Sequence, residues 1–232
     1  MESIFPESNK PKLNERNPQG MIKYHRLQKW WLNELTASER SRIRDQYTPI
    51  SGSKIDDGLY TNSSNSTVKF LKELGSWFSS KEGDRPLAEK IYKEAERNIN
   101  VSTSVVDMHF LYGRMLELFY LNRNKGNYYE LAKEYAVKQI DLATNVLKQM
   151  EQEHIRIISK TAQREGLSVL DFPFRAPSHS GYKQLAIVYK KEKRWDDVIL
   201  LCEQAITQGW CGDWENRVDE AIRERLKEKA PN

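Results

Sequence analysis

The sequence predicts an all-α protein in which helical hairpins stack into a solenoid. Apolar residues recur three or four positions apart through most of the 232 residues, which is the period of an amphipathic helix. Charged residues make up 30% of the chain and apolar residues 38%, a balance that suits stacked helices with wide solvated faces. The first helix of each of three predicted hairpins contains a small residue, where a second helix can approach closely: Gly75, Gly113 and Ala186.

The chain is predicted to begin with a flexible arm over residues 1–18, followed by a pair of helices over residues 19–50. The first helix has an apolar face over nearly four turns, formed by Tyr24, Leu27, Trp31 and Leu35. Thr36 and Glu39 have the spacing of a capping box, so the second helix should begin there. It should end just before Pro49, because proline disfavours a helical conformation in the residue that precedes it.

The predicted array of hairpins covers residues 66–229. It follows a loop over residues 51–65 that is rich in Gly, Ser, Asn and Asp, and Ser66 or Thr67 should cap its first helix. Pro86 falls in the first turn of the return helix, where the missing N–H of proline costs nothing.

An inserted helix and a connector interrupt the array over residues 151–177. The helix is polar with a thin apolar stripe, and Pro173 and Pro177 should keep the connector rigid and extended. A heavily charged helix is predicted from Trp214 onward. Its outer face would meet water, so it should act as the terminal capping helix.

The third hairpin, residues 178–210, has the most regular pattern in the chain. Four residues share one side of its first helix: Tyr182, Leu185, Ala186 and Tyr189. Val198, Cys202 and Ala205 share one side of the second helix, and Trp210 closes the unit. These offsets resemble the tetratricopeptide repeat, in which small residues of the first helix meet small and aromatic residues of the second. Val198, Cys202 and Trp210 depart from the alanine, aromatic and proline of the general pattern.

Four stretches resemble uncharacterised tetratricopeptide-like (TPR-like) proteins of bacteria and phages. They are residues 30–36 (WWLNELT), 70–78 (FLKELGSWF), 182–189 (YKQLAIVY) and 206–214 (ITQGWCGDW). The resemblance covers residues 22–229 and implies a TPR-like solenoid. It brings no catalytic motif with it.

Composition indicates a cytoplasmic protein without a membrane segment. The N-terminus lacks a basic region followed by an apolar one, and no apolar run approaches the roughly 20 residues that span a bilayer. Two cysteines, Cys202 and Cys211, are too few for a disulfide framework or a four-ligand zinc site. A net charge of +4 is modest for a nucleic-acid-binding protein of this length.

Signatures of common enzymes are missing from the sequence, so a non-enzymatic protein without cofactor or metal is expected. There is no glycine-rich phosphate loop, nucleophile elbow or His-Glu-x-x-His helix. None of the four histidines, His25, His109, His154 and His179, has a second His or Cys three or four residues away. His109 could face a groove, and His179 follows Ser178, the expected cap of its helix. An enzyme of unfamiliar type around either histidine stays open as an alternative.

The predicted function is protein or peptide binding in the concave groove of the array. The first helix of each hairpin would line this groove, and the candidate partner-binding residues are Lys69, Lys72, Phe110, Arg114, Lys183 and Lys190. A cationic lining with one aromatic residue favours an acidic peptide or a C-terminal carboxylate. The competing interpretation is that these lysines are ordinary solvated residues of helix surfaces.

Nucleic-acid binding by the N-terminal helices is the second hypothesis. Arg40, Arg42 and Arg44 form the densest basic group in the chain. Their alternate spacing, at about 200° per step around a helix, scatters them, which argues against a helix that reads a DNA groove.

Three tryptophans, Trp30, Trp210 and Trp214, leave two interpretations open. They could form a surface for self-association, or they could simply pack inside the protein.

Overall fold

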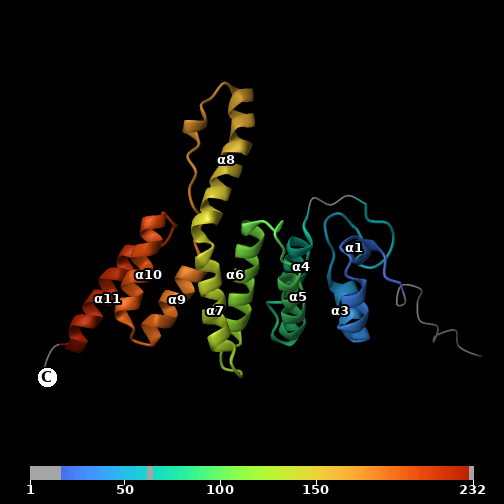
Figure 1. Cartoon of the computed structure of the whole chain (residues 1–232), viewed down its shortest axis with the longest axis horizontal. Coiled ribbons are helices and arrows are strands. Elements are labelled where there is room, and N and C mark those ends of the chain that lie inside the picture. Colours follow the sequence, from blue (N-terminus) through green and yellow to red (C-terminus); the bar gives the residue numbers. More distant parts are fainter. Residues whose placement is uncertain (1–16, 62–64, 230–232) are drawn as a thin grey trace, which may run out of the picture. The chain divides into compact units, whose positions relative to one another are not determined.

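The computed structural model describes residues 17–61 and 65–229, and its regular elements are all helices (Figure 1). Over these two ranges there is no β-strand, and a single isolated bridge joins Ser178 to Cys211. The prediction of an all-α protein is confirmed. Most of the predicted N-terminal arm, residues 1–16, lies outside the described residues. No helix in the described part of the chain is both long and apolar enough to cross a membrane.

The chain divides into two compact units, the first ending at Ile99 and the second beginning at Asn100. In the first unit the helices are α1 (Gly20–Tyr24), α2 (Gln28–Asn33), α3 (Ala37–Gln46), α4 (Thr67–Ser76) and α5 (Arg85–Arg97), with a short 3₁₀ helix, η2 (Glu82–Asp84), before α5. The hairpin of α4 and α5 supplies most of the fully buried side chains, among them Leu71, Leu74, Ile91 and Tyr92.

The prediction of one continuous helix up to Leu35 is wrong, because the chain breaks between α1 and α2. Arg26 adopts the left-handed conformation at φ 58°, which ends the first helix. The start of α1 is hydrogen-bonded to the following loop, since the N–H groups of Gly20 and Ile22 donate to carbonyls of residues 58 and 55. As a result Tyr24 lies at the surface with 39% of its area exposed, while the other three predicted core residues stay buried.

The predicted capping box at the start of α3 is confirmed. The N–H of Glu39 donates to Thr36 Oγ1 at 3.2 Å, and the N–H of Thr36 donates to Glu39 Oε2 at 2.8 Å. Lys90 of α5 also binds Glu39, with Nζ 2.7 Å from Oε1, so the cap lies next to a contact between α3 and α5. The box therefore fixes the start of a helix that packs within the first unit.

Replacing Thr36 with alanine should lower the free energy of unfolding of the first unit by about 1 kcal/mol, because the N–H of Glu39 loses its acceptor. Urea unfolding of the full chain, combined with amide hydrogen exchange within α3, measures this. Thr36→Ser keeps the hydroxyl and is the matched control. Equal stability of the two variants would show that the capping hydrogen bond does not stabilise α3.

The second unit contains α6 (Val105–Leu121), α7 (Tyr128–Asp141), α8 (Ala143–Glu165), α9 (Ser180–Lys191), α10 (Trp195–Gln208) and α11 (Trp214–Lys229), with a 3₁₀ turn, η3 (Val169–Asp171), before α9. The helices α6 and α7 form one hairpin and α9 and α10 another, and α9 lies between α7 and α10 (Figure 1). The last helix, α11, packs on α10. Each helix thus contacts the one before it or the neighbouring hairpin.

The inserted helix is present but longer than predicted. It begins at Ala143, directly after a break at Leu142, and ends at Gly166, which takes the left-handed cap conformation. Its outer half projects beyond the hairpin of α6 and α7, and the connector returns along it (Figure 1). A hydrogen bond of 2.8 Å between His154 Nε2 and the carbonyl oxygen of Phe172 joins the two.

The three tryptophans that were considered for self-association are all buried: Trp30, Trp210 and Trp214. The Nε1 of Trp214 donates to the carbonyl oxygen of Trp210 at 2.8 Å, so these two pack on each other within the second unit. The structure therefore favours plain packing for these side chains over an exposed aromatic surface.

Candidate functional site

A groove of about 820 Å³ lies between α9 and α11 in the second unit. Two contacts show that the helices run in the same direction. Just before their first residues the N–H of Cys211 donates to the carbonyl oxygen of Pro177 at 3.2 Å, and near their ends Lys193 Nζ lies 3.4 Å from Glu228 Oε1. The turn and first helical residues of α10 close the bottom of the space between them.

The floor of this groove is apolar. Ala186 and Ile187 come from α9, Trp195 and Val198 from α10, and Ala221 from α11. Trp195 and Val198 are three residues apart, so they lie on one face of α10, the face that is turned toward the groove. Ala186, Val198 and Ala221 are almost fully buried, because α9 and α11 both pack on α10.

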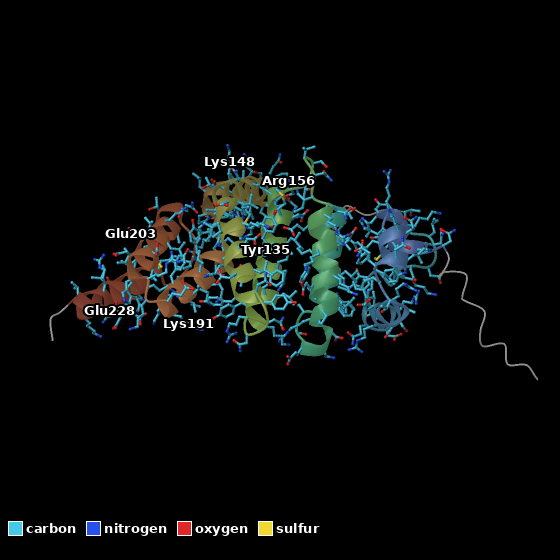
Figure 2. The ribbon with its side chains drawn as sticks, turned by 60° about the horizontal axis from the view of Figure 1, so that its bottom comes forward. Tyr135, Lys148, Arg156, Lys191, Glu203 and Glu228 are labelled. Carbon is cyan, nitrogen blue, oxygen red and sulfur yellow. The ribbon has the colours of Figure 1, made fainter. Side chains whose placement is uncertain are left out.

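The two walls of the groove carry opposite charges. Lys190, Lys191 and Lys193 line it on the α9 side, and Glu220, Glu224 and Glu228 line it on the α11 side. The α11 side also has Asp213 and Arg217, which pair with each other at 2.8 Å, so its net charge stays negative. Lys190 Nζ lies 2.6 Å from Glu220 Oε1, so an ion pair bridges the walls. Lys191 Nζ also donates to Tyr120 OH at 2.9 Å. Lys191 and Glu228 mark the ends of the two helices in Figure 2.

Of the six residues predicted to bind a partner, Lys190 lines this groove. Lys183 is exposed on α9 but does not line it. Arg114 lies on α6 and pairs with Glu117, with Nη1 3.1 Å from Oε2. Phe110, 44% exposed on α6, makes a T-shaped ring contact with His109. The remaining two, Lys69 and Lys72, belong to α4 of the first unit.

The acidic wall was missed in the sequence because the last helix was interpreted as a cap. Glu220, Glu224 and Glu228 are four residues apart, so they lie on one face of α11. That spacing could have indicated an acidic stripe. A uniformly cationic lining holds for the α9 side of the groove only.

The three arginines of the nucleic-acid hypothesis are all engaged within the first unit. Arg40 donates to the carbonyl oxygens of residues 31 and 35. Arg42 forms two hydrogen bonds with the carboxylate of Asp84, of 3.1 and 2.9 Å, and Arg44 forms two with Oδ2 of Asp56, of 2.9 and 2.6 Å. A phosphate group would have to compete with these partners.

The two histidines that were considered for an unfamiliar enzyme lie together in the core of the second unit. The ring centroids of His109 and His179 are 4.8 Å apart, and both rings contact Trp210. Gln139 Nε2 donates to the carbonyl oxygen of His109 at 3.1 Å and lies 3.3 Å from its Nε2. His109 is therefore buried rather than facing a groove.

His179, and not the expected Ser178, is the N-cap of α9. Its Nδ1 accepts a hydrogen bond of 3.2 Å from the N–H of Tyr182, which requires this nitrogen to be unprotonated. Burial lowers the pKa of His179 to about 3 and that of His109 to about 4. Both rings are neutral at neutral pH, and their contacts give them a structural role in joining α6, α7 and α9.

In the described ranges, no three His, Cys, Asp or Glu side chains are grouped so that they could hold a metal ion. Cys202 is buried in α10, and burial raises the pKa of its thiol to about 11.

Similarity to known proteins does not add a candidate site. No protein-family model matches the chain, and no curated protein or solved structure is significantly similar to it.

Proposed function

We propose that this chain is a cytoplasmic, non-enzymatic protein- or peptide-binding module of TPR-like type, and that the groove between α9 and α11 is its binding surface. The observation that carries the proposal is the groove itself, which combines an apolar floor with charged walls. Binding surfaces commonly have this arrangement, in which a desolvated apolar centre is surrounded by a polar rim.

The packing of the second unit supports the TPR-like part of the proposal. Small residues lie where its helices cross. A Cβ added to Gly113 of α6 would come within 2.6 Å of Gln139 Nε2 on α7, and Ala186 of α9 is 2% exposed. The first helices of consecutive hairpins run in the same direction in such repeats, and α9 and α11 also run in the same direction, on either side of the groove. The volume of the groove, about 820 Å³, is within the range of ligand-binding clefts.

A groove-filling variant tests the function. Asn216 is exposed and lines the groove, so Asn216→Trp places a large ring in it without disturbing a buried position. We expect random 16-residue peptides displayed on phage to be enriched by the wild-type chain and to lose binding to Asn216→Trp. Asp219→Trp, at an exposed position of α11 outside the groove, should bind them as the wild type does. Failure to enrich any peptide, or unchanged binding by Asn216→Trp, would contradict the proposal.

A further inference from the structure

The opposite charges of the two walls identify the class of partner. We propose that the groove binds a single amphipathic α-helix whose apolar stripe lies between an acidic flank and a basic flank. This inference rests on the proposed function, since it names the partner of the same groove. The expected acidic peptide would meet Lys190, Lys191 and Lys193 favourably on one side but would be repelled by the glutamates of α11 on the other.

The groove has a basic wall, an apolar floor and an acidic wall side by side. Its partner must therefore present an acidic, an apolar and a basic row in the same order. An extended strand offers two faces, one down and one up, so it cannot place an apolar row between two charged rows along its length. A helix can, with apolar residues at i, i+3, i+4 and i+7 and charges on either side. With 12 residues in α9 and 16 in α11, the walls are about 18–24 Å long, which matches a helix of similar length.

The ion pairs across the groove can be replaced by ion pairs with a partner. In the pair Lys190–Glu220 the side chains are 48% and 43% exposed, and in Lys193–Glu228 they are 73% and 44% exposed. Exposed pairs of this kind contribute little, about 0–1 kcal/mol each. A partner helix that offers a carboxylate to each lysine and a cation to each glutamate replaces both pairs without leaving a charge uncompensated. A partner with one sign of charge cannot do so.

A helical display library tests the inference directly. Its 16-residue peptides carry leucine along one stripe and Glu, Lys or Gln at random in the positions that flank the stripe. We expect the wild-type chain to select opposite charges on the two flanks and to bind these peptides about tenfold more tightly than versions with one sign on both. Enrichment of peptides with two acidic flanks or without charge preference overturns the inference but not the proposed function. If no peptide depends on the groove, as judged with Asn216→Trp, both fail.

Exchange of the walls provides a second, sharper measurement. Combining Lys190→Glu and Lys193→Glu with Glu220→Lys and Glu228→Lys reverses the net charge of both walls, although Lys191 and Glu224 are unchanged, and preserves the possibility of each ion pair. A selected peptide should then bind in the opposite direction, because turning a helix end for end exchanges its flanks. Cys211 is exposed, two residues before Asp213 at one end of the groove, and can trap a peptide by disulfide exchange.

The trapping experiment uses two versions of the selected peptide, with an activated thiol at the N-terminus or at the C-terminus. One version should form the disulfide with the wild-type chain and the other with the wall-exchanged chain. Cys211→Ser should trap neither, since Cys202 is buried. Trapping of the same version by both chains would show that wall charge does not orient the partner and would overturn the inference.

Discussion

Replacing Gly75 with alanine should lower the free energy of unfolding of the first unit by about 1–3 kcal/mol. A Cβ at this position would lie 2.3 Å from Cε1 and 2.6 Å from Cδ1 of Tyr92 on α5. The phenol ring is fully buried, as are Leu71 and Leu74 of α4, so it has no free space to move into. The two helices must therefore separate or the ring must leave its position, and either change weakens the packing of the hairpin.

Two comparisons separate this clash from the general effect of a glycine substitution. Gly83 lies in η2, and a Cβ there would meet nothing within 4 Å, so Gly83→Ala should be neutral or slightly stabilising. In the background of Tyr92→Leu, Gly75→Ala should cost much less than in the wild type, because the ring is gone. Equal costs in both backgrounds, measured by urea unfolding, would show that contact with Tyr92 is not the reason Gly75 is needed.

Features that depend on local sequence were predictable. The capping box at Thr36 and the cap at Ser66 each need only one turn of helix, so the pattern contains all the interactions involved. The close approach at Gly75 was predictable for a related reason, since a small residue within an apolar helical face is typical of a helix crossing.

The break at Arg26 was not predictable from helical periodicity. The apolar spacing around it is compatible with one long helix, and a non-glycine residue with positive φ gives no sequence signal. What redirects the chain is a set of hydrogen bonds between the start of α1 and the loop at residues 55–58, 33 to 38 residues away in sequence. Tertiary contacts of this kind override local preference.

The groove was only partly predictable for the same reason. The position of Lys190 in the groove could be predicted, because it lies on the exposed face of α9. The opposite wall depends on where α11 packs against α10. The cluster of His109, His179 and Trp210 depends on three separate segments meeting in the core. Neither the proximity of these three side chains nor their burial follows from spacing along the chain.

Acid should destabilise the second unit well before its carboxylates are protonated. The pKa values of about 4 for His109 and about 3 for His179 are both below the value of 6.5 that applies to an unfolded chain. The unfolded state therefore binds protons as the pH falls below 6.5, while the folded state does not until the pH approaches 4. Over that interval the free energy of unfolding should fall by about 1.4 kcal/mol per pH unit for each histidine.

A double variant isolates this contribution. His109→Phe keeps a ring to stack on Trp210, and His179→Asn keeps a side-chain acceptor for the N-cap of α9, but neither residue titrates. Other groups that titrate in the same range, such as the buried His25 of the first unit, are common to both chains and cancel in the comparison. Urea unfolding of the second unit between pH 6.5 and 4.5 should give a steep decline for the wild type and a shallow one for the variant. Parallel curves would mean that the two imidazoles accept protons in the folded core as readily as in water, which their burial against Trp210 and Gln139 argues against.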